Sequence, residues 1–257
     1  MSAIATAHVL AALALPDATR VDQRVPKKLL AEHGAATAAD KRQVQDGVDG
    51  VQWLASLKPH LIGVPAFKDA QREYLEVAVL SLKLKPGTKP GRLAELLHRA
   101  VPYPMLLVTS SDLGVSLSLA HIRASQNEAD KTVLDGAVLS VLLPDASSGQ
   151  DFYVAMALAR QPQADLFTLY QGWLDTAGAL DIAEETGHFQ PSLTREQAAA
   201  RHAALQDCRQ LKAQITQLRS QADKERQIAR QVALNQEIHA AERQLLTLQR
   251  TLSGDAA

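Results

Sequence analysis

The sequence predicts an α+β protein, with a mixed α/β domain over residues 1–187 and a long C-terminal coiled-coil helix or helical hairpin over residues 188–257. Two observations predict this organisation. Apolar strands alternate with amphipathic helices in the first part of the chain, a pattern typical of packed α/β layers. Residues 194–252 contain no Gly or Pro, which favours continuous helix. The stretch from Gly187 to Pro191 is therefore the predicted domain boundary.

The first predicted element is an apolar, Ala-rich helix over residues 3–15. It has no Lys or Arg before its apolar run and is too short to cross a bilayer, so we expect neither a signal peptide nor a membrane anchor. Pro26 ends an extended stretch that begins at Arg20. The elements expected next are helices over 27–34 and 37–45 and a strand over 51–57.

The clearest strand covers residues 74–85 and is closed by Pro86 and Gly87. An amphipathic helix over 92–100 and a short apolar strand over 105–109 follow it. Strand, helix, strand units of this kind usually form parallel pairs with a right-handed crossover. We therefore expect a mixed sheet with a parallel pair at this point.

Three further segments complete the predicted domain. The alternating run 115–122 follows Asp112-Leu113-Gly114, which predicts a hairpin with the preceding strand. Another strand is expected over 133–143. One or two helices, interrupted near Pro162, are expected over 152–182.

The C-terminal segment begins with a capping box, Thr194-Arg195-Glu196-Gln197. A single helix of this length would span roughly 85 Å at about 1.5 Å per residue, so it needs a partner, a fold-back or its own copy. Its apolar residues form two stripes that are out of phase, so the packing must change between Ala222 and Leu234. An antiparallel hairpin or two contact faces is therefore favoured over a straight zipper. The residues expected to contact a partner are Leu211, Ile215, Leu218, Leu234, Ile238, Leu245, Leu248 and Leu252.

Composition limits the classes of partner and compartment. Lys and Arg total 27 and Asp and Glu total 28, for a net charge of -1, so nucleic-acid binding would need a local basic patch. The single cysteine, Cys208, lies inside the predicted C-terminal helix and fits a reducing compartment, so we expect a cytoplasmic protein. The sequence contains no phosphate-loop, dinucleotide, zinc or nucleophile-elbow motif, and we expect no cofactor and no bound metal.

One pattern resembles metal-dependent nucleases of the restriction-endonuclease type. These enzymes place a Glu-x-Lys at the end of a strand that precedes a helix and another strand. Here Ser81-Leu82-Lys83 and Lys83-Leu84-Lys85 occupy that place, and the metal-binding carboxylate is missing. We expect a degenerate nuclease-like unit or an unrelated β-α-β unit. The alternative is a divergent nuclease that uses Asp69, Glu73 or Glu76 together with Lys83 or Lys85.

A basic stretch overlaps this unit. Its cations would contact phosphate without reading sequence, or they are ordinary solvated charges beside Pro-Gly turns. The residues concerned are Lys83, Lys85, Lys89, Arg92 and Arg99.

Three segments resemble a bacterial family of uncharacterised proteins, the domain of unknown function 4391. They are Arg24-Val25-Pro26-Lys27, the strand from Glu76 to Lys83, and Ala100-Val101-Pro102-Tyr103-Pro104-Met105-Leu106-Leu107. The resemblance covers residues 21–182. Many relatives carry an acidic residue where Ser81 stands. Family members often lie beside helicase and DNA methyltransferase genes in restriction or antiviral islands, which implies an accessory role in such a system.

These observations lead to one main hypothesis and two alternatives. The main hypothesis is a non-enzymatic accessory subunit whose α/β domain docks on a helicase-like ATPase or a DNA methyltransferase and whose C-terminal helices mediate assembly. Self-association through the C-terminal helix is a further option. The alternatives are a divergent metal-dependent nuclease and a DNA-binding module that uses the basic stretch. No membrane partner is expected.

Overall fold

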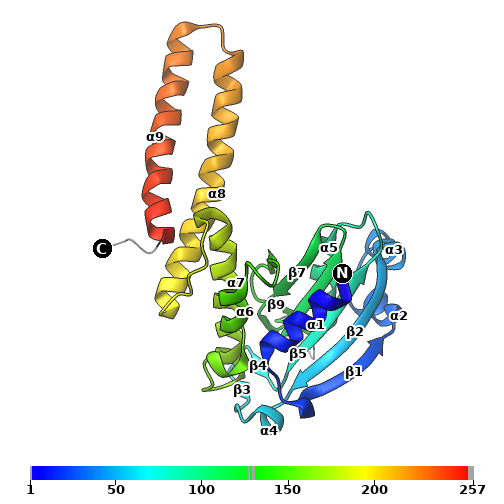
Figure 1. The fold of residues 1–257 in the computed structure, drawn as a ribbon. Coiled ribbons are helices and arrows are strands. Elements are labelled where there is room, and N and C mark those ends of the chain that lie inside the picture. The colour runs from blue at the N-terminus through cyan, green and yellow to red at the C-terminus, as the bar shows by residue number, and fades with distance from the viewer. Residues whose placement is uncertain (1, 127, 129–130, 254–257) are drawn as a thin grey trace. The chain divides into compact units, whose positions relative to one another are not determined.

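The computed structural model describes residues 2–126, 128 and 131–253 (Figure 1). The chain divides into two compact units, residues 1–177 and 178–257, and the division falls inside helix α7 (Leu166–Thr186). The first unit contains a mixed six-stranded sheet with helices, and the second is helical. The predicted α+β class with a long C-terminal helical region is confirmed.

The sheet has the strand order β1-β2-β5-β6-β7-β10. Strands β5 and β6 pair in parallel through the crossover helix α5 (Pro90–Ala100), and the other neighbours pair antiparallel. The predicted strand, helix, strand unit and the hairpin after it are therefore confirmed. The strands are β1 (Arg20–Val25), β2 (Val48–Leu57), β5 (Val77–Leu84), β6 (Met105–Ser111), β7 (Gly114–Leu119) and β10 (Leu139–Leu142).

Two predicted strands are divided in the structure. The run 115–122 ends its strand at Leu119, and the segment 133–143 separates into β9 (Thr132–Leu134) and β10. Gly136 lies between them with a φ of 103°, a left-handed conformation that turns the chain away from β9. Strand β9 then pairs with β8 (Ile122–Ala124) in a separate two-stranded sheet, as β3 (Phe67–Lys68) does with β4 (Glu73–Tyr74).

One face of the large sheet is covered by three helices, α2 (Lys27–His33), α3 (Ala38–Gly47) and α5. The even-numbered residues of β5 point to this face, where Leu80 and Leu82 pack with Leu96 of α5. The end of α2 lies so close to α5 that a Cβ on Gly34 would be 2.4 Å from the Leu96 carbonyl oxygen. This tight packing closes the core on the α5 side.

The other face carries helix α1 (Ser2–Leu13), whose Val9 and Leu13 are buried. The predicted N-terminal helix is thus confirmed. The remaining elements of this unit are η1 (Asp17–Thr19), α4 (Pro59–Ile62), α6 (Gln150–Ala155) and η2 (Leu158–Arg160). Helices α6 and α7 correspond to the predicted helical segment 152–182, with the interruption near Pro162 as expected.

The second unit contains α8 (Arg195–Lys224) and α9 (Ile228–Ser253), which pack antiparallel as a hairpin. A single helix over 194–252 is therefore wrong, because the chain turns at residues 225–227, inside the predicted phase change. Glu225 explains the turn, since its carboxylate accepts hydrogen bonds from the amides of Arg226 (2.8 Å) and Gln227 (2.9 Å). The capping box is confirmed, because the Gln197 amide donates to the Thr194 hydroxyl at 3.1 Å.

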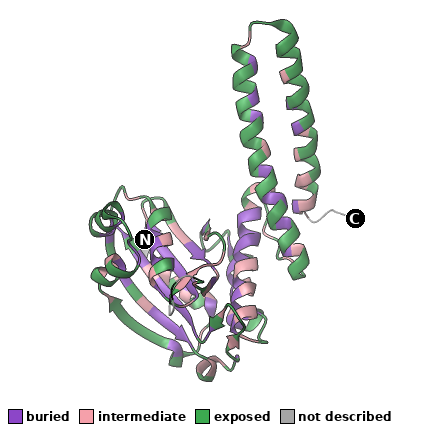
Figure 2. Cartoon of the chain, turned by 180° about the vertical axis from the view of Figure 1, so that it is seen from behind, coloured by how far each residue is buried: buried purple, intermediate pink, exposed green. Residues whose placement is uncertain are grey.

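The seam of the hairpin uses the predicted stripes. Ile215, Leu218 and Ala222 of α8 pack against Ile238 and Ala241 of α9. At the open end of the hairpin, Leu205 and Cys208 pack with Leu252 and with Ile182 of α7. All eight residues expected to contact a partner lie in or beside this seam, and most of the remaining hairpin surface is exposed (Figure 2). Among the described helices, none is both long and apolar enough to cross a membrane.

Candidate functional site

A pocket of about 820 Å³ lies between α1 and one face of the sheet. Alternation along β5 places Ser81 and Lys83 on this face, because Leu80 and Leu82 point to the opposite core. Gln52 of β2 pairs with Ser81, so strand register brings a second polar side chain to the same place. The charged and polar side chains that line the pocket are Asp22, Arg24, Asp49, Gln52, Ser81, Lys83, Ser110 and Thr6.

Lys83 forms an ion pair with Asp49 of β2 at 2.8 Å between the ammonium nitrogen and a carboxylate oxygen. The hydrogen bond from Lys83 lowers the pKa of Asp49, and the charges of Lys27 and Lys85 act in the same direction. Asp49 is therefore ionised at neutral pH. Both side chains remain substantially exposed, so the pair is open to exchange with a ligand.

Asp22 reaches the pocket from the edge strand β1 through an irregular backbone. The register with β2 shifts between Arg20 and Gln23, and Asp22 has a φ of 49°, in the left-handed region. A bulge of this kind re-aims the side chain of the extra residue, and Asp is one of the few residue types that tolerates the conformation. Two strands thus each contribute one carboxylate, Asp22 from β1 and Asp49 from β2.

Several donors in the pocket have no partner among the residues that the structure describes. The Ser110 hydroxyl makes no hydrogen bond within the described part of the chain, although Ser110 is only 6% exposed. The hydroxyl of Ser81 and the guanidinium of Arg24 likewise lack hydrogen-bond or ion-pair partners among the described residues. The Ser110 oxygen is not among the fully buried side-chain atoms that lack a partner, so water in the pocket reaches it. The pocket therefore has the donors that an oxygen-rich ligand requires.

The structure separates the acids of the predicted nuclease from Lys83. Asp69 accepts hydrogen bonds from the amides of Gln71 (2.7 Å) and Arg72 (2.6 Å), which stabilises a turn. Glu73 pairs with Lys68 at 2.6 Å.

Glu76 is the third acid of that set. It is 8% exposed and accepts a hydrogen bond from Ser56 at 3.0 Å, with Lys58 at 3.5 Å. The described lining of the pocket includes Lys83 and none of these three acids. Lys85 also lies outside that lining and donates to the Gln45 carbonyl at 3.4 Å.

The predicted basic stretch is divided between two faces of the sheet. Arg92 and Arg99 lie on α5, on the face opposite to Lys83. Arg92 donates two hydrogen bonds of 2.9 Å to Asp40, and both arginines bond Glu95. Lys89 lines a separate hollow of about 900 Å³ near the start of α5. The five cations therefore do not form one continuous patch.

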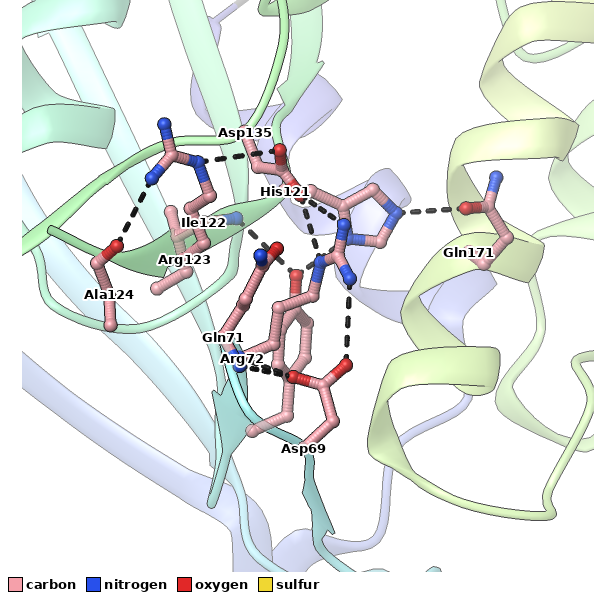
Figure 3. Close-up of polar contacts among 10 residues, drawn as sticks. Asp69, Gln71, Arg72, His121, Ile122, Arg123, Ala124, Asp135 and Gln171 are labelled. Atoms are coloured by element: carbon pink, nitrogen blue, oxygen red, sulfur yellow. Dashed lines mark hydrogen bonds and ion pairs between the residues drawn. The ribbon is translucent and has the colours of Figure 1, made fainter. Parts of the chain in front are cut away.

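A second polar cluster lies around β4, β8 and α7 (Figure 3). Arg72 donates to Asp135 from Nε (2.8 Å) and from a terminal nitrogen (2.6 Å). This bonding raises the pKa of Arg72. The Arg72 guanidinium also lies 5.5 Å from the centre of the Phe167 ring, an additional cation–π contact.

Tyr74 and His121 form the inner part of this cluster. The Tyr74 hydroxyl is 2.6 Å from His121 Nδ1, and His121 Nε2 is 2.9 Å from the Gln171 side-chain oxygen. Tyr74 is fully buried, which raises its pKa. Each polar group in this chain of contacts has a hydrogen-bond partner within the protein. The cluster therefore stabilises the packing of β4, β8 and α7 against one another.

The sequence identified Lys83 and missed Asp22, Arg24, Asp49 and Ser110. Asp49 lies between Gly47 and Gly50, where the sequence predicts a break between a helix and a strand. Asp22 lies in a stretch that the sequence identifies only as extended. Only the pairing of β1, β2, β5 and β6 places these residues along the lining of one pocket. An Asp and a Lys on strands expected to be neighbours would have been the available signal.

Comparison with known proteins adds one finding. The sequence model of the family described as "Domain of unknown function (DUF4391)" matches residues 13–245. No curated protein and no solved structure matches the chain. The family match includes every polar residue of the pocket from Asp22 to Ser110 and most of the C-terminal hairpin.

Proposed function

We propose that this chain, which belongs to the DUF4391 family, is a non-enzymatic accessory subunit of a bacterial DNA-modification or antiviral defence complex. In this proposal the C-terminal hairpin docks on a helicase-like ATPase or a DNA methyltransferase. The observation that supports it is a groove of about 500 Å³ between α8 and α9.

The groove has the composition of a helix-binding surface. Ile215 and Leu245 form its apolar floor, and Leu246 stands at its side with 61% of its surface exposed. Arg219 and Glu242 form an ion pair of 2.8 Å across the two helices at the same place. An apolar floor with charged edges is the arrangement that accepts the apolar face of an added helix.

The exposed apolar residues of α9 extend this surface. Ile228 is 77% exposed and Val232 is 50% exposed. Spacings of 4 and 18 residues from Ile228 place Val232 and Leu246 on the same side of an α-helix. The hairpin already has its own seam, so these side chains are not needed to hold α8 to α9.

Affinity purification of the tagged full-length chain from its native host tests this function. We expect a helicase-like ATPase or a DNA methyltransferase to co-purify with the unmodified chain and to be lost with Leu246→Glu. Leu193→Glu is the matched control, because Leu193 is 91% exposed and lies outside the described lining of the groove. Retention of the partner by Leu246→Glu would contradict docking in the groove.

Light scattering of the purified chain distinguishes a foreign partner from a second copy. A monomer that gains mass only with its partner is the result expected for an accessory subunit. A stable dimer that Leu246→Glu converts to monomer would assign the groove to self-association.

A second candidate function, a divergent metal-dependent nuclease, is favoured by one observation. Antiparallel strands β1, β2 and β5 are followed by α5 and the parallel strand β6, and Lys83 of β5 lies beside Asp49 of β2. This order fits the nuclease arrangement expected from the sequence. Incubation with DNA and Mg²⁺ or Mn²⁺, alone and with the partner, tests it, and cleavage must be lost in Lys83→Ala.

A further inference from the structure

We propose that the pocket beneath α1 binds a small organic acid. Its carboxylate accepts hydrogen bonds from Arg24, Gln52 and Ser81, and its apolar part lies against Leu10 and Leu54. This binding site is independent of the accessory-subunit function, which depends on the C-terminal hairpin.

The three donors lie side by side on adjacent strands. Arg24 of β1 is directly opposite Gln52 of β2, and Gln52 is directly opposite Ser81 of β5. Neighbouring strands are about 4.8 Å apart, and residues directly opposite each other project from the same face of a sheet. A carboxylate above Gln52 is therefore within reach of the long Arg24 side chain from one side and of the Ser81 hydroxyl from the other.

The same three side chains are available for binding. None of them has a hydrogen bond or an ion pair with another residue in the described part of the chain. Arg24 and Gln52 are exposed and Ser81 is half-buried, so solvent reaches all three donors. A ligand can therefore replace solvent at Arg24, Gln52 and Ser81 without breaking a contact between described residues.

The charges in the pocket favour a ligand with a single negative charge. Lys83 is paired with Asp49 at 2.8 Å, and Arg24 is the other cation of the described lining. The strand register places Asp22 beyond Arg24, on the side away from Lys83. A dianionic phosphate would add two charges where the two aspartates are already negative. A carboxylate matches the charge of Arg24, and its planar group accepts two parallel hydrogen bonds from a guanidinium.

Leu10 of α1 and Leu54 of β2 provide an apolar wall beside the donors. Leu54 lies two residues beyond Gln52 on the same strand and is 5% exposed, and Leu10 lines the pocket from the helix. The neighbouring lining residue of α1, Ala7, has a small side chain that leaves space between helix and sheet. The volume of about 820 Å³ lies within the range usual for small-molecule sites. A short aliphatic acid therefore fits both the polar and the apolar part of the lining.

Titration of the ¹⁵N-labelled full-length chain with sodium hexanoate, followed by NMR, tests the site. We expect saturable chemical-shift changes at the backbone amides of Gln52 and Ser81. Arg24→Ala should weaken hexanoate affinity by about tenfold or more, because a hydrogen-bonded opposite charge is lost. Ser81→Ala should weaken it by about threefold, because a neutral hydrogen bond contributes less.

Arg20 provides a matched control on the same strand. Its side chain is 71% exposed, forms an ion pair with Asp17 and lies outside the described lining of the pocket. Arg20→Ala should leave hexanoate affinity unchanged. Arg24→Lys keeps the charge but not the planar pair of donors, so it should recover only part of the affinity that Arg24→Ala loses. Circular dichroism of every variant shows whether the fold is retained.

Comparison of probes tests which part of the ligand is recognised. Hexan-1-ol, which has no charge, should bind at least about tenfold more weakly than hexanoate. Acetate should also bind more weakly, by about fourfold for each methylene group that hexanoate buries. Equal affinity for hexanoate and hexan-1-ol would overturn the carboxylate site.

Two further outcomes would overturn the proposal. One is the absence of saturable shifts at Gln52 and Ser81, or an affinity for hexanoate that Arg24→Ala leaves unchanged. The other is tighter binding of inorganic phosphate than of hexanoate, with loss of phosphate binding in Lys83→Ala, which would assign the pocket to phosphate. Leu246→Glu should leave hexanoate binding unchanged, so failure of the docking function and failure of this site are distinguishable.

Discussion

The cluster around Arg72 and the pocket beneath α1 belong to the same unit, but their polar groups are in opposite situations. In the Arg72 cluster, a chain of contacts from Asp135 to Gln171 gives each polar end a partner within the protein. In the pocket, Ser81, Ser110 and Arg24 have none among the described residues. Residue types alone do not separate the two, since both contain arginine and aspartate.

This difference indicates which polar groups stabilise the folded state and which are available to bind a ligand. In a polar network that is shielded from water and in which every group has a partner, removal of one member leaves the others unpaired and lowers the stability of the fold. An unsatisfied group contributes little to stability, and its removal affects a ligand instead. Mutations in the two regions should therefore give different phenotypes, unfolding in one and lost binding in the other.

The largest expected effect concerns His98, a satisfied group buried on the α5 side. Its Nε2 is 3.0 Å from the Ser118 hydroxyl, and burial lowers its pKa from 6.5 to about 4. The folded pKa lies below the unfolded value, so stability is fully present above about pH 6.5 and is lost as pH falls toward 4. The difference corresponds to about 3 kcal/mol.

Urea unfolding between pH 7 and 4 measures this effect. The variant His98→Gln has no titrating group at this position, so its stability should fall less over the same interval. Equal pH dependence of the variant and the unmodified chain would show that His98 titrates normally and would weaken the comparison.

Removal of the Tyr170 hydroxyl should produce the next largest loss. The hydroxyl accepts from the Ala120 amide at 2.9 Å and donates toward the Met105 carbonyl at 2.8 Å, and Tyr170 is fully buried. Tyr170→Phe leaves these backbone groups without that partner, at a cost of about 2 kcal/mol in unfolding free energy. Tyr103→Phe is the control, because its hydroxyl has no hydrogen bond to a described residue. Equal losses in the two variants would contradict the account.

A double-mutant cycle on Arg72 and Asp135 tests the outer part of the satisfied cluster. Their side chains are 29% and 26% exposed, so water weakens the pair without removing it. We expect a coupling energy of about 1.5 kcal/mol in chemical denaturation. The matching cycle on Asp49 and Lys83, which are more exposed, should give less than about 0.5 kcal/mol.

The smallest change in stability is expected at Thr109 and Ser110, neighbours on opposite faces of β6. Neither hydroxyl has a hydrogen-bond partner among the described residues, but Thr109 faces the closed core and Ser110 faces the pocket. Thr109→Val should be neutral or stabilise by up to about 1 kcal/mol. Ser110→Ala should change stability by less than about 0.5 kcal/mol. Urea unfolding measures both variants, and a loss of more than about 1 kcal/mol in Ser110→Ala would contradict the comparison.

Local patterns were sufficient to predict the elements that dominate the fold. The alternation in β5, the apolar face of α5 and the apolar run of β6 each depend on residues close in sequence, and all three elements were found where expected. The turn at 225–227 was harder, because no Gly or Pro marks it. Its cause is the Glu225 side chain, which takes over two backbone amides, while the phase change in the apolar stripes only bounds its position.

The candidate site was much less predictable. Lys83 was identified from its spacing to Ser81, but the acids proposed beside it were those nearest in sequence, Asp69, Glu73 and Glu76. The structure places those carboxylates with Lys68, Arg72 and Ser56. Asp49 reaches Lys83 through the pairing of β2 with β5, and such register is set by long-range packing.

A crystal structure of the full-length chain at a resolution that shows ordered water tests the central comparison most directly. The account predicts water or a bound solute against Ser81, Ser110 and Arg24 in the pocket, and a direct pair between Arg72 and Asp135 in the cluster. Protein partners for all three pocket groups, or water between Arg72 and Asp135, would contradict it.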